Sequence, residues 1–491
     1  MNLDFQYKLR QLLDYEYTRF KWIKSDFKSP WLLLVVAICL AFGFRALLLI
    51  DASTLWLDEL YTVGKSFQPF DGLLASLRDD AHPPFYNVIL WFWGQLVGQN
   101  PVSLRLFSWL AYLIGGLVMV QQANALAQNS IKASGIAAVF AFCSPFPIRY
   151  AIEGRSYSFL LLLISLAWWS RSSVRPIIYG LLVALVGMTH FYGLPLFLAA
   201  SFWDGCNRRW SLSAASFIGV IPGLCWLVYA SEALFSGHGG WIPSPNFGLF
   251  EETLARCIGI WPVPKLLLVL ILLGVLRRWG VAGMLHRPKF VLLDKSGLIP
   301  TILMVIGVII FSLIKPIAFS RYFIVILPAV VPFLAVQVSK WELNRFGLSC
   351  CLVVFGLLLA SWWGPGFAEI NPGSSAVRES DQFRSISQRT SGFVDRYSPR
   401  ARWFNLSDRM ELSMGRIPSD PSPWGGFALL EARLSQSTPP KEIWLASSST
   451  QANHHRRQLQ LFQDQVERIG YICNDRSEGL IHARLLRCRP A

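Results

Sequence analysis

The sequence predicts an all-α polytopic membrane protein that carries a small α/β domain at its C-terminal end. Of its 491 residues, 53% are hydrophobic and only 15% are charged. A soluble protein of this length carries charges on about a quarter of its residues. The apolar residues are also gathered into long runs, as expected of helices that cross a bilayer.

About eleven apolar segments approach the roughly 17–25 residues that a membrane helix needs. They lie near residues 31–50, 104–126, 133–150, 156–170, 176–190, 191–206, 211–230, 264–277, 297–314, 322–339 and 346–363. Residues 1–30 hold a basic cluster, and no small-residue cleavage site follows the first run, so we expect an uncleaved cytoplasmic segment. This segment either lies on the membrane as an amphipathic helix or only sets the topology.

The apolar run at residues 85–97 decides the topology, because it is short for a full span. If it crosses the membrane, the basic loops around Arg171, Arg208 and Lys340 fall outside. If it lies along the outer interface, they fall inside with the N-terminal cluster, in agreement with the positive-inside rule. We therefore expect a surface helix here, and the net charge of +15 reflects topology rather than nucleic-acid binding.

This topology leaves three large parts on the outer side: residues 51–103, 231–263 and 364–491. The second is rich in turns and ends in a short amphipathic helix that suits the membrane surface. The third alternates helical with strand-like patterns after a Gly- and Pro-rich linker, which predicts the small extracytoplasmic domain. Its helical patterns lie at 379–395, 427–435 and 451–469, and its strand-like runs at 442–446, 470–474 and 480–488.

Two of the nine cysteines, Cys473 and Cys488, lie in the last two strand-like runs. They can pair across a hairpin if this domain occupies an oxidising compartment. Two free thiols are the alternative.

The first outer loop holds a group of acidic residues in a chain that is otherwise short of them. Asp58 and Glu59 follow the first apolar segment, whereas Asp79, Asp80 and His82 precede the surface helix. Acidic groups near a bilayer are costly unless they have partners or water, so such a group indicates function.

Neighbouring residues on a helix point about 100° apart, so Asp58 and Glu59 cannot both face one atom. We expect Asp58 to act as a base and Glu59 to support it; an N-cap role for Asp58 is the alternative. Asp80 and His82 are expected to help bind the sugar or the acceptor, although the aspartates can also cap the surface helix. The spacing leaves a divalent-metal site open without predicting one.

Basic residues at the outer ends of later segments depart from the positive-inside pattern. They are Arg105, Arg149, Arg155, His190, Lys315 and Arg321. Several cations opposite a few carboxylates suit an anionic lipid head, because arginine binds phosphate through paired hydrogen bonds. Pairing with local carboxylates, or extension of the side chain to lipid headgroups, is an equally strong explanation for Arg105, His190 and Lys315. It is a weaker explanation for Arg155 and Arg321.

Sugar transfer from a polyprenyl phosphate fits this set of groups. The phosphate leaves readily, so one carboxylate is needed to take the proton of the acceptor hydroxyl. Cations stabilise the charge on the departing phosphate, and a single displacement inverts the anomeric centre. A transporter or flippase of lipid-linked sugars, without transfer chemistry, is the alternative function.

Six stretches resemble, in order, the signature motifs of the GT-C membrane glycosyltransferases. They read LWLDELYT, DDAHPPFYNVILWFW, SLRLFSWL, SPFPIRYAIEGRSYSFLLL, THFYG and SRYFIVILP. The most similar subset is the superfamily of protein O-mannosyltransferases and aminoarabinose transferases, which includes bacterial members of unassigned acceptor. The resemblance covers residues 30–340 and leaves residues 364–491 without a counterpart.

The resemblance implies a polyprenyl-phosphate-sugar donor, catalysis at the outer face of a bacterial plasma membrane, and an acidic pair at the catalytic centre. It implies that Arg155 and Arg321 lie near the lipid phosphate, and it adds Tyr157 of the Arg-Ser-Tyr motif to the substrate-binding residues. We expect residues 31–363 to form the catalytic domain. Whether the acceptor is a glycolipid, a polysaccharide or a protein stays open, and no cofactor is implied.

Overall fold

The structure is a computed structural model that describes part of the chain. The described residues are 30–50, 57–67, 69–78, 82–143, 150–231, 242, 244–258, 290–340, 402–405, 410–412, 443–448, 460, 463–464, 466–476 and 483–491. Asp79, Asp80, the side chain of Asp58 and the apolar segments expected at 264–277 and 346–363 lie outside them. So do the helices expected at 379–395 and 427–435.

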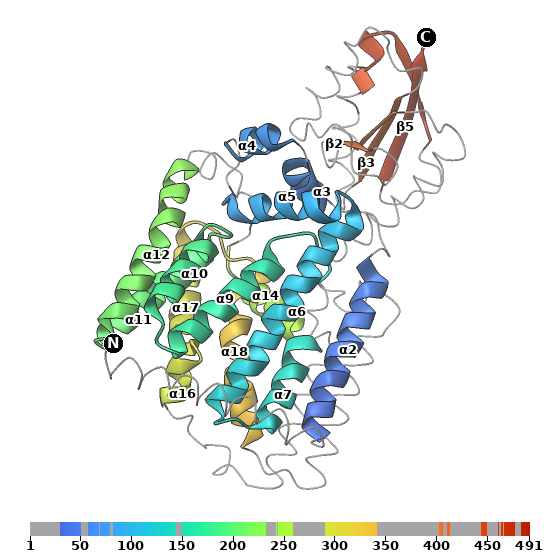
Figure 1. Ribbon diagram of the computed structural model, residues 1–491. Coiled ribbons are helices and arrows are strands. Elements are labelled where there is room, and N and C mark those ends of the chain that lie inside the picture. Colours follow the sequence, from blue (N-terminus) through green and yellow to red (C-terminus); the bar gives the residue numbers. More distant parts are fainter. Residues whose placement is uncertain are drawn as a thin grey trace, which may run out of the picture.

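Apolar helices packed side by side form most of the described part (Figure 1). They are α2 (Pro30–Ile50), α6 (Pro101–Leu126), α7 (Ile131–Phe142), α9 (Tyr157–Ser172), α10 (Pro176–Gly187), α11 (Gly193–Cys206), α12 (Trp210–Tyr229), α17 (Leu298–Ile314) and α18 (Leu327–Ser339). Helix α6, helix α12 and residues 320–339 are long and apolar enough to cross a membrane. Each helix overlaps a segment that the sequence predicts to span.

Small residues let neighbouring helices approach closely, as in other membrane bundles. At the crossing of α10 and α12, a Cβ atom on Gly219 would lie 2.6 Å from the carbonyl oxygen of Gly180. The largest fully buried side chains are aromatic and include Trp168, Tyr112 and Phe142. Close backbone contact and buried rings together fix how the helices cross.

Three short helices lie at one end of the bundle (Figure 1): α3 (Leu57–Ser66), α4 (Phe70–Arg78) and α5 (Phe85–Val97). Helix α5 occupies the residues expected of the surface helix and runs across the direction of α6. Its first backbone N–H, at Phe85, donates to the carbonyl oxygen of Met188 at 2.9 Å. The Tyr229 hydroxyl at the end of α12 donates to the carbonyl oxygen of Arg78 at 2.8 Å. The first loop is therefore tied to the ends of two bundle helices.

Two further elements shape the same end. The amphipathic pattern in the later outer loop forms α14 (Phe247–Ile258), which packs against a 3₁₀ helix, η1 (Ser320–Ile326). The sequence predicts one continuous span at 322–339, but an α-helix begins only at Leu327. Pro328, in the first turn of α18, accounts for this start because its fixed φ suits that position.

The opposite end of the bundle is joined by an ion-pair network. Arg171 at the end of α9 contacts Asp204 of α11 at 2.7 Å and Asp294 of α16 (Phe290–Lys295) at 3.0 Å. Arg209, which precedes α12, pairs with the same two aspartates. Basic residues that the sequence marks as topological signals therefore also hold four elements together.

The described C-terminal residues form a five-stranded sheet with strand order β2-β1-β3-β5-β4. The strands are β1 (Arg402–Asn405), β2 (Met410–Leu412), β3 (Ile443–Ser448), β4 (Tyr471–Asp475) and β5 (Ala483–Pro490). Strands β1 and β3 are parallel, and the other neighbours are antiparallel. Strands β3, β4 and β5 overlap the predicted runs, whereas β1 and β2 were not predicted from the sequence. In Figure 1 the sheet lies beyond the end that carries α3 and α5.

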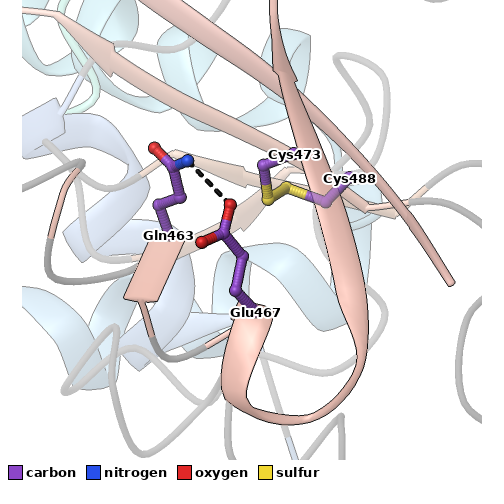
Figure 2. Close-up of a disulfide and its surroundings, with 4 residues drawn as sticks. All are labelled: Gln463, Glu467, Cys473 and Cys488. Carbon is purple, nitrogen blue, oxygen red and sulfur yellow. Dashed lines mark hydrogen bonds between the residues drawn. A yellow bond between two sulfur atoms is a disulfide. The ribbon is translucent and has the colours of Figure 1, made fainter. Parts of the chain in front are cut away.

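A disulfide joins Cys473 of β4 to Cys488 of β5, and the two residues are direct partners in the strand register (Figure 2). Beside it, the Gln463 amide donates to the Glu467 carboxylate at 2.8 Å (Figure 2). The bond cross-links the last two strands of the sheet.

Candidate active site

A pocket lies where α3, the approach to α5, the start of α9, the α10–α11 turn and η1 meet. It is lined by Thr62, Lys65, His82, Pro83, Tyr86, Asn87, Arg155, Ser156, Tyr157, Thr189, His190 and Tyr322. Four of these lining residues are site residues predicted from the sequence: His82, Arg155, Tyr157 and His190.

Lys65 is the main pocket residue that the sequence analysis missed. It is 4% exposed, in the last turn of α3, and it lines the pocket together with Thr62, three residues earlier on the same helix. Residues three and four apart share a helix face. The sequence signal was thus the spacing of Thr62 and Lys65 behind Asp58, which places all three positions along one face of a helix.

Glu59 is 1% exposed, and both of its carboxylate oxygens accept hydrogen bonds. Arg105 of α6 donates through Nε at 2.9 Å and Nη2 at 2.8 Å, and the Gly154 backbone N–H donates to Oε1 at 2.8 Å. Paired charge-assisted bonds of this kind are strong and geometrically specific. Glu59 consequently ties α3 to α6 and to the segment that carries Arg155. Two explanations for Arg105 were left open by the sequence, lipid-phosphate binding and pairing with a local carboxylate. The structure shows the second, an ion pair with Glu59.

Arg155 reaches from the start of α9 toward α3, where Nη1 donates to the Thr62 hydroxyl at 3.4 Å. The preceding residue, Gly154, packs so closely that a Cβ atom there would lie 2.4 Å from Leu104. Glycine is therefore required beside the arginine, and the arginine is positioned by a tightly packed backbone.

An aromatic wall closes the pocket around His190. The imidazole ring lies 5.9 Å from the ring of Tyr157 and 5.3 Å from that of Tyr322, measured between centroids. The Tyr192 ring is 5.8 Å away, and its hydroxyl donates to the carbonyl oxygen of Ile317 at 2.8 Å. The α10–α11 turn is thereby joined to the segment that leads into η1.

Two cationic side chains, Lys65 and Arg155, line the pocket. Burial, and then the charges of His82, Arg155 and Arg321, lower the pKa of His190 to about 3. Arg321 thus acts on the pocket although it does not line it; its guanidinium lies 5.0 Å from the Phe319 ring and 5.7 Å from the Tyr322 ring. Lys315 stands at the C-cap of α17 and is not among the lining residues either.

Metal ligands are not grouped in the part of the chain that the structure describes: no three His, Cys, Asp or Glu side chains there are placed to hold an ion. Asp80 and the side chain of Asp58 are outside that part.

Two crystal structures resemble the chain over nearly its whole length. ArnT from Cupriavidus metallidurans in the apo state superimposes with a TM-score of 0.56 at 12% sequence identity, covering 94% of this chain and 98% of that one. ArnT from the same organism bound to undecaprenyl phosphate gives a TM-score of 0.53 at 12% identity, covering 93% and 98%. No protein-family model and no curated protein matches the sequence.

These likenesses establish the fold. The chain has the mostly helical, polytopic fold of ArnT, a GT-C aminoarabinose transferase, and the resemblance drawn from the sequence motifs is confirmed at that level.

Proposed function

We propose that the protein is an inverting membrane glycosyltransferase. It moves a sugar from a polyprenyl-phosphate donor to a glycolipid, polysaccharide or protein acceptor on the outer side of the membrane. The observation that carries the proposal is the pocket in which the cations Lys65 and Arg155 lie together with His82. The ArnT fold adds support, because ArnT has been crystallised with undecaprenyl phosphate.

Asp58 is the proposed base. Position 58 precedes Thr62 by four residues and Lys65 by seven on α3, and both of those residues line the pocket. Helical periodicity therefore supports a location of position 58 on the pocket side of α3. In the reaction, the carboxylate takes the proton of the acceptor hydroxyl while the acceptor oxygen bonds to the anomeric carbon. The bond from that carbon to the phosphate oxygen breaks, and the phosphate leaves with the electron pair.

Arg155, Lys65 and Arg321 are proposed to stabilise the phosphate charge as it develops. Their positive field is in place before the donor binds, so little reorganisation is needed during the reaction. Lys315, Asp80, His82 and Tyr157 remain proposed substrate-binding residues. Glu59 is proposed to act as a positioning residue, because its carboxylate is already bonded to Arg105 and Gly154.

We further propose about eleven membrane spans, a cytoplasmic N-terminus and an extracytoplasmic domain at 364–491, in a bacterial plasma membrane. The Cys473–Cys488 disulfide supports this placement of the C-terminal residues, because such bonds persist in oxidising compartments. The catalytic part is proposed to be residues 31–363.

The substitution Asp58→Asn tests the proposal. Membranes that contain the wild-type protein should transfer label from a polyprenyl-phosphate sugar to an endogenous acceptor, and the variant should lose that transfer. Asp58→Asn leaves Glu59 and its partners Arg105 and Gly154 in the chain, so the control is to compare membranes that hold equal amounts of the two proteins. Full transfer by Asp58→Asn would contradict the assignment. An unchanged sugar linkage together with altered transbilayer movement of the donor would favour the flippase instead.

A further inference from the structure

The imidazole of His190, in the turn between α10 and α11, presents an uncharged N–H group to the pocket. The Tyr192 backbone N–H donates to Nδ1 of His190 at 3.2 Å, so Nδ1 acts as an acceptor. A neutral imidazole with an acceptor at Nδ1 carries its proton on Nε2. No described residue accepts a hydrogen bond from Nε2, and His190 lines the pocket. The Nε2–H is therefore available to a ligand.

The ring has little freedom to turn. The tyrosine rings at positions 157, 192 and 322 surround it at centroid distances of 5.9, 5.8 and 5.3 Å. The Tyr192 hydroxyl is itself anchored on the carbonyl oxygen of Ile317. Rotating the imidazole by half a turn would break the bond at Nδ1, so the ring is held with Nε2 directed away from its own turn.

The charge state of the ring follows from its neighbours. Arg155 before α9, Arg321 in η1 and Lys65 of α3 place positive charge around the pocket, and His82 before α5 also lines it. The remaining titratable groups at the ring are the hydroxyls of Tyr157, Tyr192 and Tyr322. With burial and cations both opposing protonation, the imidazole is uncharged between about pH 5 and pH 8.

We propose that Nε2–H of His190 donates a hydrogen bond to a non-bridging phosphate oxygen of the ligand in this pocket, between the arginine and lysine charges. This rests on the proposed function. A donor-only group suits a phosphate oxygen, which accepts only, whereas a sugar hydroxyl takes either role. As a neutral donor, the histidine binds the anion without adding to the repulsion among the cations.

Three substitutions in the full-length protein separate this contact from a packing role. In His190→Gln the amide nitrogen lies near the position of Nε2, and in His190→Asn it lies near that of Nδ1. His190→Phe keeps the ring and removes both nitrogens. We expect His190→Gln to bind undecaprenyl phosphate within about threefold of the wild type, and the other two to bind about 10- to 100-fold more weakly.

A comparison of undecaprenyl phosphate, undecaprenol and inorganic phosphate identifies the chemical group that His190 recognises. Binding of undecaprenol, which has no phosphate, should be the same in all four proteins. If inorganic phosphate shows the same ranking as undecaprenyl phosphate, the phosphate alone is sufficient for the contact. If only the lipid shows the ranking, the site selects a lipid phosphate. Wild-type affinity in His190→Phe would overturn the proposal, as would a His190→Gln variant that melts like the wild type but binds as weakly as His190→Phe.

A pH series tests the neutral state. The ratio of wild-type to His190→Phe affinity should stay constant between about pH 5.5 and pH 8, because the other titrating groups are common to both proteins. A ratio that rises as the pH falls would mean a charged imidazolium and would overturn the proposal. If the His190 variants show the expected ranking but the protein transfers no sugar, only the proposed transferase function is contradicted. A failure of that function can therefore be told apart from a failure of the proposed His190–phosphate contact.

Discussion

Both carboxylate oxygens of Glu59 are occupied by protein donors, one guanidinium and one backbone N–H. The sequence identifies the acidic pair, because two adjacent acids after a membrane segment are unusual. It does not identify the partners, since Arg105 and Gly154 follow Glu59 by 46 and 95 residues. Lys65 has a sequence signal, its helical spacing from Asp58 and Thr62, but only the packing of α3 shows that this helix face lines the pocket. Pairings of this kind follow from tertiary structure alone.

Removing the Glu59 carboxylate should destabilise the protein. Glu59→Gln leaves Arg105 buried with a neutral partner, and breaking a buried ion pair on one side costs about 3–5 kcal/mol. We expect a lower melting temperature for Glu59→Gln and for Arg105→Gln, with the double variant less destabilised than the sum of the two. Asp58→Asn is the matched control and should melt like the wild type. Additive effects in the double variant would contradict the coupling.

The apolar helices that the structure describes overlap predicted segments, because long apolar runs are easily recognised in a sequence. Helix α5 has the predicted bounds, since a proline pair precedes it and Gly98 ends it with a positive φ of 106°. The strands were harder. Strands β1 and β2 have four and three residues, too few for alternation to be read from the sequence. Strands β4 and β5 were recognised by their longer runs and their cysteines.

Loss of the disulfide should loosen the last two strands. The bond closes a loop with a sequence separation of 15, for which a stabilisation of about 3 kcal/mol is typical. We expect Cys473→Ser to speed proteolysis within residues 402–491 and to leave the helical bundle intact. Cys206→Ser, which changes a free exposed cysteine at the end of α11, is the control. Equal proteolysis rates in the two variants would show that the bond contributes no stability.

At the scale of the whole molecule, charge is divided between the two ends of the bundle. One end carries the pocket and its cations. At the other end, the arginines pair with Asp204 and Asp294, so their charge is neutralised within the protein. Burial opposes ionisation of Asp294, but hydrogen bonds from Arg209 and the charge of Arg171 lower its pKa to about 2. The positive field therefore acts at the pocket end, where an anionic lipid head is proposed to bind.

The anomeric configuration of the product distinguishes an inverting transfer from a retaining one. The purified protein, in lipid nanodiscs with a polyprenyl-phosphate sugar of known configuration, should yield a glycoside of the opposite configuration, because the site is proposed to act by one displacement with Asp58 as base. Asp58→Asn should give no product under the same conditions. A product that keeps the donor configuration, or a donor that crosses the bilayer without losing its sugar, would contradict the account.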